Sequence, residues 1–177
     1  ALSLPAQEVV IYGGTPGGIA AAIAAARLGR EVTLVEYHRH IGGMTASGLG
    51  ASDIEHRELI HGFFREFVDR IKVHYVAAHG AQSEQVKLCK DGYWYEPSAA
   101  EKIFESFIAE QPGITVVKHH QLEGAETMNG RLVSVTVLNR TTKERRELRA
   151  RVFADATYEG DLIAAAGADE HGCRPEA

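Results

Sequence analysis

The feature that most constrains this chain is a glycine-rich turn set between an apolar run and an alanine-rich segment. Residues 9–29 read VVIYGGTPGGIAAAIAAARLG. The β-rich run at 8–12 leads directly into glycines, which is typical of a buried parallel strand. The alanine-rich run at 17–28 predicts a helix that Gly29 ends. A second β-rich run at 31–36 completes a strand–helix–strand unit of about 30 residues.

The turn follows the G-x-G-x-x-G spacing of dinucleotide-binding proteins at two of its three glycine positions. Gly13 and Gly18 stand in the frame, and Thr15 occupies the middle position. In such a turn a pyrophosphate lies against backbone N–H groups at a helix N-terminus, where the helix dipole also favours negative charge. Pro16 suits the first helical residue and Gly17 leaves room for a ligand. The Thr15 hydroxyl is a candidate donor to a phosphate oxygen.

A carboxylate ends the second strand of the unit. Glu36 follows Gly18 by 18 residues. A carboxylate at this place can accept hydrogen bonds from both hydroxyls of an adenosine ribose, and it repels a 2′-phosphate. Strand, turn, helix, strand and acidic residue together predict an adenine dinucleotide and disfavour NADP. The competing interpretation is a turn that only packs a helix on a sheet.

Helical and extended segments alternate along the rest of the chain. This order predicts an α/β fold: a doubly wound, Rossmann-like parallel sheet with helices and an inserted antiparallel β-meander. Asn129 and Gly130 indicate a hairpin turn within the meander. The expected elements are a helix at 56–77, a helix that a Ser98–Glu101 capping box opens and that ends near residue 110, a strand at 114–120, meander strands within 122–150, and a strand at 151–156 before a further helix.

Composition excludes several classes of function. The 177 residues carry a net charge of −5 and no long basic run, which argues against a nucleic-acid partner. The longest apolar run, 18–26, is too short to cross a bilayer, so we expect a soluble protein without a membrane partner, either cytoplasmic or exported after removal of a signal. Cys89 and Cys173 form no C-x-x-C pair, and the nine histidines show no metal-ligand spacing. We therefore expect no metal site.

Three longer motifs make the chain resemble a known family. They are YGGTPGGIAAAIAAARLG at 12–29, RHIGGMTASGLG at 39–50 and DATYEGDL at 155–162. They are similar to motifs of the FAD-dependent oxidoreductases in the glutathione-reductase-like superfamily, in which Thr-Pro within the turn is common. The resemblance implies FAD as the cofactor and hydride transfer between an organic substrate and FAD. It also implies that residues 1–177 are an incomplete FAD-binding domain, without the substrate domain and C-terminal segment of longer relatives.

The resemblance further implies which residues contact FAD. The pyrophosphate would lie against Gly13, Thr15, Pro16, Gly17 and Gly18, and the adenosine ribose would bind Glu36. The ribityl chain and the flavin ring would contact Arg39, Gly42, Gly43 and Met44, and the adenine would contact Gln121 and Leu122. A second cofactor turn would consist of Ala156, Thr157, Gly160 and Asp161. Catalytic residues stay unassigned, because the flavin itself carries the redox chemistry.

Several alternatives stay open at this stage. A truncated fragment without cofactor and an NAD-dependent dehydrogenase are the rival functions. The substrate is a small molecule, with carbohydrate-like compounds included, and an oligomer is not ruled out. His40 could tether a flavin covalently, although a loop histidine that is hydrogen-bonded to the cofactor or to the backbone is favoured. The phenylalanines at 63, 64 and 67 are expected in the core, and the aromatic run at 93–95 is either core or a stacking surface.

Overall fold

The computed structural model describes residues 7–168, whose contacts divide them into two compact units. The first unit contains the described residues of Ala1–Arg39 and Gly113–Ala177, and the second is His40–Pro112. The first unit holds all the strands of the sheet, and the second is helical. Cys173 lies outside the described residues, and Cys89 is a buried free thiol.

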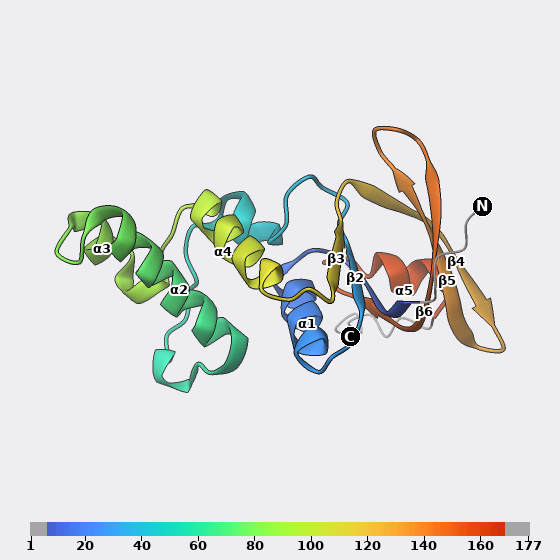
Figure 1. The fold of residues 1–177 in the computed structure, drawn as a ribbon, viewed down its shortest axis with the longest axis horizontal. Coiled ribbons are helices and arrows are strands. Elements are labelled where there is room, and N and C mark those ends of the chain that lie inside the picture. The colour runs from blue at the N-terminus through green and yellow to red at the C-terminus, as the bar shows by residue number, and fades with distance from the viewer. Residues whose placement is uncertain (1–6, 169–177) are drawn as a thin grey trace, which may run out of the picture. The chain divides into compact units, whose positions relative to one another are not determined.

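The first unit is built on a six-stranded mixed sheet in the order β3-β2-β1-β6-β5-β4 (Figure 1). The pairs β1–β2, β2–β3 and β1–β6 are parallel, and β4–β5 and β5–β6 are antiparallel. This arrangement confirms the expected α/β, Rossmann-like fold with a meander. The strands are β1 (Gln7–Tyr12), β2 (Val32–Val35), β3 (Ile114–Val117), β4 (His120–Met128), β5 (Arg131–Asn139) and β6 (Arg145–Asp155).

The last meander strand and the last parallel strand are one element, which corrects the expectation of two. In β6 the segment 145–149 pairs with β5, and the segment 150–155 pairs with β1. The strand therefore changes partners at residues 149 and 150 without a break in the chain. Its first half is charged except for Leu148, whereas its second half is mostly apolar, and this change of pattern imitates a boundary between two strands.

The expected strand at 114–120 is also divided differently. β3 ends at Val117, and β4 begins at His120. Between them His119 has a φ of 62°, and its N–H donates to the carbonyl oxygen of His38 at 2.8 Å. A non-glycine residue in the left-handed region turns the chain sharply, so one β-rich run supplies strands with two different directions.

Helix α1 (Pro16–Arg27) packs through its buried residues Gly18, Ile19, Ala22 and Ile23. Gly29 has a φ of 76°, and its N–H donates to Ala26, so it ends the helix in the expected left-handed conformation. The side chains of Val10 and Tyr12 lie in a hydrophobic core cluster of the first unit. This cluster also contains Val135 and Val137 of the meander and Leu162 of α5 (Asp161–Ala165). Asn129 and Gly130 both have positive φ in the β4–β5 turn, as the hairpin signal predicts.

The second unit contains α2 (Gly62–His79), α3 (Glu84–Leu88) and α4 (Pro97–Ala109), with short turns at Thr45–Leu49, Arg57–Leu59 and Lys90–Gly92. The expected helix at 56–77 was placed too early, because Ile60 is extended and Gly62 has a φ of 63°. The expected capping box is wrong. Pro97 is the first residue of α4, and the Glu101 carboxylate instead accepts the N–H of Ile41.

Aromatic residues fill the core of the second unit. Phe67 and Phe104 stack with ring centroids 4.7 Å apart, and the ring of Tyr95 meets Phe67 edge-on at 5.5 Å. Phe67 is buried as expected, whereas Phe63 and Phe64 are half-buried. Of the run at 93–95, Tyr93 and Tyr95 are buried and Trp94 is 45% exposed.

Among the described residues, no helix is long and apolar enough to cross a membrane. Within residues 7–168, no group of three or more His, Cys, Asp or Glu side chains is arranged so that it could hold a metal ion.

Candidate dinucleotide-binding site

The candidate site lies in the first unit, where three parallel strands end side by side. Tyr12, the last residue of β1, pairs with Val35 of β2 and with Asp155 of β6. The chain leaves β1 toward β2 on one side, while β6 arrives on the other side. Ligands of open α/β sheets bind at such a switch point, beyond the carboxyl ends of the strands.

Backbone hydrogen bonds join the segments that leave these strands. The N–H of Gly13 donates to Val35 at 2.8 Å, and the N–H of Ala156 donates to Tyr12 at 2.8 Å. The N–H of Glu36 donates to Val117 at 2.9 Å. The first glycine turn, the end of β2 and the turn after β6 are therefore fixed to one another by main-chain bonds.

Gly13 and Gly18 are required by close contacts between backbones. A Cβ on Gly13 would lie 2.6 Å from the carbonyl carbon and oxygen of Ala156, and the φ of Gly13 is 110°. A Cβ on Gly18 would lie 2.0 Å from the carbonyl oxygen of Gly13. Both positions therefore exclude any side chain, which explains why these two glycines of the pattern are present.

Thr15 caps helix α1 and also bonds the second turn. Its Oγ1 accepts the N–H of Gly18 at 3.2 Å and donates to the carbonyl oxygen of Ala156 at 2.8 Å. A hydroxyl has a single proton. In this arrangement the proton is directed to Ala156, so Thr15 acts on the shape of the turn, and its contact with a phosphate oxygen stays a prediction.

The first turn of α1 stays open on the side of Gly17. Gly17 is exposed, and the nearest atom to a Cβ built there is Oγ1 of Thr15 at 3.7 Å. The first turn contains no acidic residue, and Pro16 is its first residue. Pro16 has no N–H, and the N–H groups of Gly18 and Ile19 donate to Thr15. The N–H of Gly17 and the helix dipole are therefore what this end of α1 offers to an anion.

Glu36 is a buried carboxylate that bonds the glycine turn. It is 6% exposed, and its Oε2 accepts the N–H of Gly14 at 2.6 Å while its Oε1 accepts the N–H of His38 at 2.7 Å. A carboxylate can accept about four hydrogen bonds. The two that remain are enough for a pair of ribose hydroxyls.

The turn after β6 is organised by Asp155, which the predicted set of site residues did not include. Its Oδ1 accepts the N–H and the hydroxyl of Thr157 at 2.8 and 2.7 Å. Its Oδ2 accepts the N–H groups of Leu162 and Ile163 at 2.7 and 3.0 Å. Burial alone would raise the pKa of Asp155, but the hydrogen bonds from Thr157, Ile163 and Leu162 outweigh it and lower the pKa. The first letter of DATYEGDL was the signal for this role.

The other predicted residues of this turn lie around Asp155. The Thr157 hydroxyl oxygen accepts the N–H groups of Gly160 and Asp161, each at 3.0 Å. Gly160 has a φ of 77° and precedes α5, and Asp161 is exposed. Ala156 is half-buried, and its carbonyl oxygen is the acceptor of the Thr15 bond.

The residues predicted at the adenine end show one unexpected contact. The N–H of Leu122 donates to the hydroxyl of Tyr12 at 2.9 Å. Gln121 is exposed on β4, and Arg39 is also exposed. The pKa of the His119 imidazole is lowered, first by desolvation and then by the positive charge of Arg39. Tyr12 was not among the predicted site residues, because an aromatic residue at the end of a buried strand is expected to serve the core.

Three predicted contacts belong to the second unit. Gly42 is buried with a φ of 101°, and a Cβ there would lie 2.8 Å from the ring of Phe104. Gly43 also has a positive φ, of 50°, and Met44 is 56% exposed. His40 lies in the same unit, and its Nδ1 is 2.9 Å from Glu101. The partner of His40 is therefore a carboxylate side chain, and not the backbone or cofactor group expected from the sequence.

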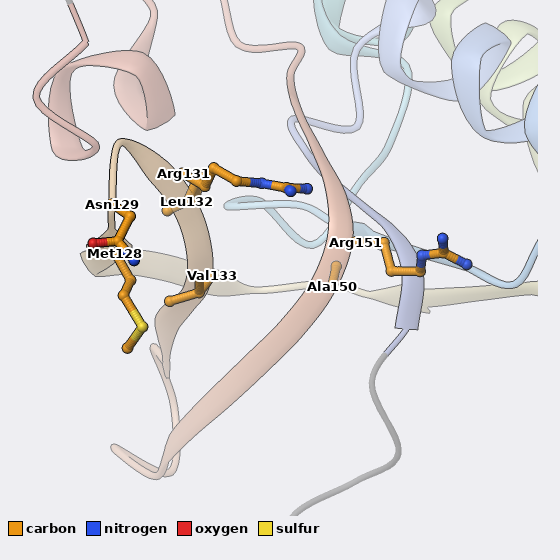
Figure 2. Close-up of a pocket in the computed structure, with 7 residues that line it drawn as sticks. All are labelled: Met128, Asn129, Arg131, Leu132, Val133, Ala150 and Arg151. Atoms are coloured by element: carbon orange, nitrogen blue, oxygen red, sulfur yellow. The ribbon is translucent and has the colours of Figure 1, made fainter.

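A pocket elsewhere in the first unit contains none of the predicted site residues (Figure 2). Ala150 lines it and pairs with Gln7, the first residue of β1, so the pocket lies at the opposite end of β1 from the glycine turn. Its lining is Met128, Asn129, Arg131, Leu132, Val133, Ala150 and Arg151.

Comparison with known proteins agrees with this geometry. The family model described as "FAD dependent oxidoreductase" matches residues 8–172. No curated protein matches the chain.

Solved structures with the same fold include three that cover most of this chain. A glycerol-3-phosphate dehydrogenase from Bacillus halodurans, complexed with FAD, has a TM-score of 0.61 at 15% identity, over 93% of this chain and 37% of that one. THI4 from Thermovibrio ammonificans has a TM-score of 0.57 at 21% identity, over 90% and 61%. The p-nitrophenol 4-monooxygenase PnpA from Pseudomonas putida DLL-E4 has a TM-score of 0.61 at 13% identity, over 92% and 44%. At these identities the likeness shows the fold, and this chain spans less than two thirds of each.

Proposed function

Since this chain belongs to the family of FAD-dependent oxidoreductases, we propose that its first unit holds the ADP part of FAD at the carboxyl ends of β1, β2 and β6. The pyrophosphate lies against the N-terminus of α1, and the ribose hydroxyls donate to Glu36. The observation that carries this proposal is that Glu36 is buried, already bonds the glycine turn through Gly14, and retains acceptor capacity.

The residues of the site fit this cofactor. The open position at Gly17 gives an anion access to the first turn of α1, where the N–H of Gly17 and the helix dipole favour negative charge. Thr15 holds that turn against Ala156 before any ligand binds. A site whose donors are already in place loses less conformational entropy when it binds a ligand.

The chemistry comes from the cofactor, and the protein binds and orients it. FAD, when bound, accepts a hydride from an organic substrate at its N5 atom. We assign no catalytic acid or base to this chain, and the substrate belongs to the class of small organic molecules. Arg39, Gly42, Gly43 and Met44 are proposed to serve the flavin end, and Gln121, Leu122, Ala156, Thr157, Gly160 and Asp161 complete the proposed contacts.

The test is a titration of the purified full-length protein with FAD, monitored by flavin fluorescence, with NADH as the rival ligand. FAD is expected to bind with one site per chain and NADH weakly or not at all. Arg131→Ala, in the pocket of Figure 2, is the matched control, because it alters the first unit at the other end of β1. No FAD uptake after reconstitution, or preferential binding of NADH, would overturn the proposal.

Activity needs a second measurement. The FAD-loaded protein is mixed with candidate alcohols, amines and hydroxy acids without oxygen, and loss of the oxidised flavin absorbance is recorded. Bleaching by one class identifies the substrate, and the same mixture without protein is the control. A protein that binds FAD but whose flavin is reduced by no organic substrate would contradict the hydride-transfer part of the proposal.

A further inference from the structure

We propose that Tyr12 is a positioning residue of the FAD site, whose hydroxyl fixes Leu122 so that the outer edge of β4 can recognise adenine. This inference rests on the proposed function. It assigns a specific role to a residue that neither the glycine pattern nor the family match identifies.

Tyr12 stands at the centre of the candidate site although its side chain is buried. It is the last residue of β1, directly before Gly13, and it is 4% exposed. Its side chain packs in the cluster that contains Val35, Val117 and Leu162. The ring is therefore held firmly, and its hydroxyl occupies a fixed place at the end of the strand.

The hydroxyl satisfies a backbone group that the sheet leaves unpaired. Within residues 7–168, β4 is at the edge of the sheet and pairs with β5. The N–H of Leu122 donates to the hydroxyl of Tyr12, a residue of β1, at 2.9 Å. The pairing of β4 with β5 also shifts register between Leu122 and Gly124, so the ladder alone holds this part of β4 poorly.

The same bond orients a second group. The N–H and the carbonyl of one strand residue point to the same side of that strand. When Tyr12 holds the N–H of Leu122, it also fixes the direction of the Leu122 carbonyl. That oxygen can accept the exocyclic amino group of adenine, and it would face the carbonyl of hypoxanthine unfavourably. The edge therefore favours adenine over a 6-oxo purine.

The electrostatic surroundings keep the Tyr12 hydroxyl neutral. Burial raises its pKa, the hydrogen bond from Leu122 opposes this effect, and the negative charges of Asp161 and Glu36 add to the rise. A neutral phenol accepts the N–H of Leu122 and still has its own proton to donate. Glu36 and Asp161, which are both proposed to contact FAD, thus act on the Tyr12 hydroxyl, which in turn fixes Leu122.

The experiment compares Tyr12→Phe with the unmodified full-length protein. Dissociation constants for FAD, ADP, inosine diphosphate and inorganic pyrophosphate are measured by calorimetry. Loss of one hydrogen bond with its desolvated partner is expected to weaken FAD and ADP by about 5- to 30-fold. The preference for ADP over inosine diphosphate is expected to narrow, and pyrophosphate binding to stay unchanged.

Tyr37→Phe is the matched control. It also removes one hydroxyl from the first unit, but the Tyr37 ring lies against the guanidinium of Arg140 at 3.8 Å and no bond joins it to Leu122 in the described residues. Its affinities for all four ligands are expected to equal those of the unmodified protein.

The outcomes separate this inference from the function on which it rests. If the unmodified protein binds no FAD, the proposed function fails. If the unmodified protein binds FAD and Tyr12→Phe binds all four ligands as tightly as it does, the positioning role is wrong. The role is also wrong if Tyr12→Phe loses as much affinity for pyrophosphate as for ADP. Amide exchange at Leu122 in the unmodified protein gives an independent measure if the variant fails to fold. Protection that ADP increases supports the role, and exchange as fast as in an open chain contradicts it.

Discussion

The hydroxyl of Thr15 donates to the carbonyl oxygen of Ala156 at 2.8 Å, and this bond joins two turns that are 141 residues apart. The hydroxyl oxygen of Thr15 also accepts the N–H of Gly18 and so caps helix α1. One side chain therefore keeps the helix N-terminus and the turn after β6 in a fixed relation. The residue that interrupts the glycine pattern is a structural bond between both halves of the candidate site.

Replacement of Thr15 by valine, which has nearly the same shape, is expected to lower the free energy of unfolding by about 1–3 kcal/mol. The variant loses the helix cap and leaves the Ala156 carbonyl without its partner. Urea unfolding followed by circular dichroism measures the change. Thr15→Ser keeps the hydroxyl and serves as the control, and equal stability of the serine and valine variants would refute this account.

Gly17 and Gly18 are adjacent and are expected to respond oppositely to alanine. At Gly18 the new Cβ would lie 2.0 Å from the Gly13 carbonyl oxygen, so Gly18→Ala is expected to prevent correct folding. At Gly17 the nearest atom is 3.7 Å away, so Gly17→Ala is expected to raise the stability of the free protein by up to about 1 kcal/mol.

FAD affinity gives the Gly17 variant a second readout. If the pyrophosphate approaches the open side of this turn, the added methyl group should weaken FAD binding while thermal unfolding of the free protein shifts upward. Thermal scans with and without FAD measure both effects. A Gly17→Ala protein that binds FAD as tightly as the unmodified one would show that the cofactor does not pass close to this position.

The glycine turn was predictable because local sequence determines it. A Cβ would clash with backbone atoms at Gly13 and Gly18, and the backbone has a positive φ at Gly13 and Gly29. Glycine is the residue that meets both requirements without strain. A backbone that needs a positive φ or a close approach therefore has glycine at that position in most proteins, so the sequence pattern predicts the turn. The α/β order followed from the period of the apolar residues, which also is local.

Contacts between distant segments were not predictable in the same way. Whether Glu101 bonds its own helix or the N–H of Ile41 depends on tertiary packing, and a capping-box spacing cannot distinguish the two. The single strand β6 was missed because its partner changes from β5 to β1 while its backbone continues. The bond from Leu122 to Tyr12 spans 110 residues and has no sequence pattern.

Glu36→Gln is expected to weaken FAD binding by about 10- to 100-fold. The amide keeps the size of the side chain but removes the charge and one acceptor from a group that bonds Gly14 and His38. Hydrogen bonds to charged groups contribute about 1.5–3 kcal/mol each, which sets the range. Fluorescence titration with FAD measures the effect.

Glu123→Gln makes the same chemical change on β4, where Glu123 pairs with Arg145 at 2.7 Å on the surface. A surface pair contributes little, so this control should bind FAD normally. If the two variants bind FAD equally, Glu36 is only a structural bond of the glycine turn, and the ribose contact must be made elsewhere.

Asp155→Asn is expected to lower the free energy of unfolding at neutral pH by about 1.5–3 kcal/mol. It is also expected to make that free energy depend less on pH in the acid range. An amide nitrogen would oppose the N–H groups of Leu162 and Ile163, which now donate to Oδ2. Because the folded-state pKa of Asp155 lies below its ordinary value of 3.8, the unfolded chain binds more protons between the two values. The stabilisation is therefore present above about pH 3.8 and is lost as the pH falls through the folded-state pKa.

Urea unfolding from pH 7 down to the acid limit tests this prediction. The difference in stability between the unmodified protein and Asp155→Asn should be constant near neutral pH and should shrink below about pH 4. Asp69→Asn alters an exposed aspartate that pairs with Arg65 one helical turn away, and it should cost less than about 0.5 kcal/mol. A difference that persists unchanged into acid would mean that the Asp155 carboxylate does not hold the second turn through its charge.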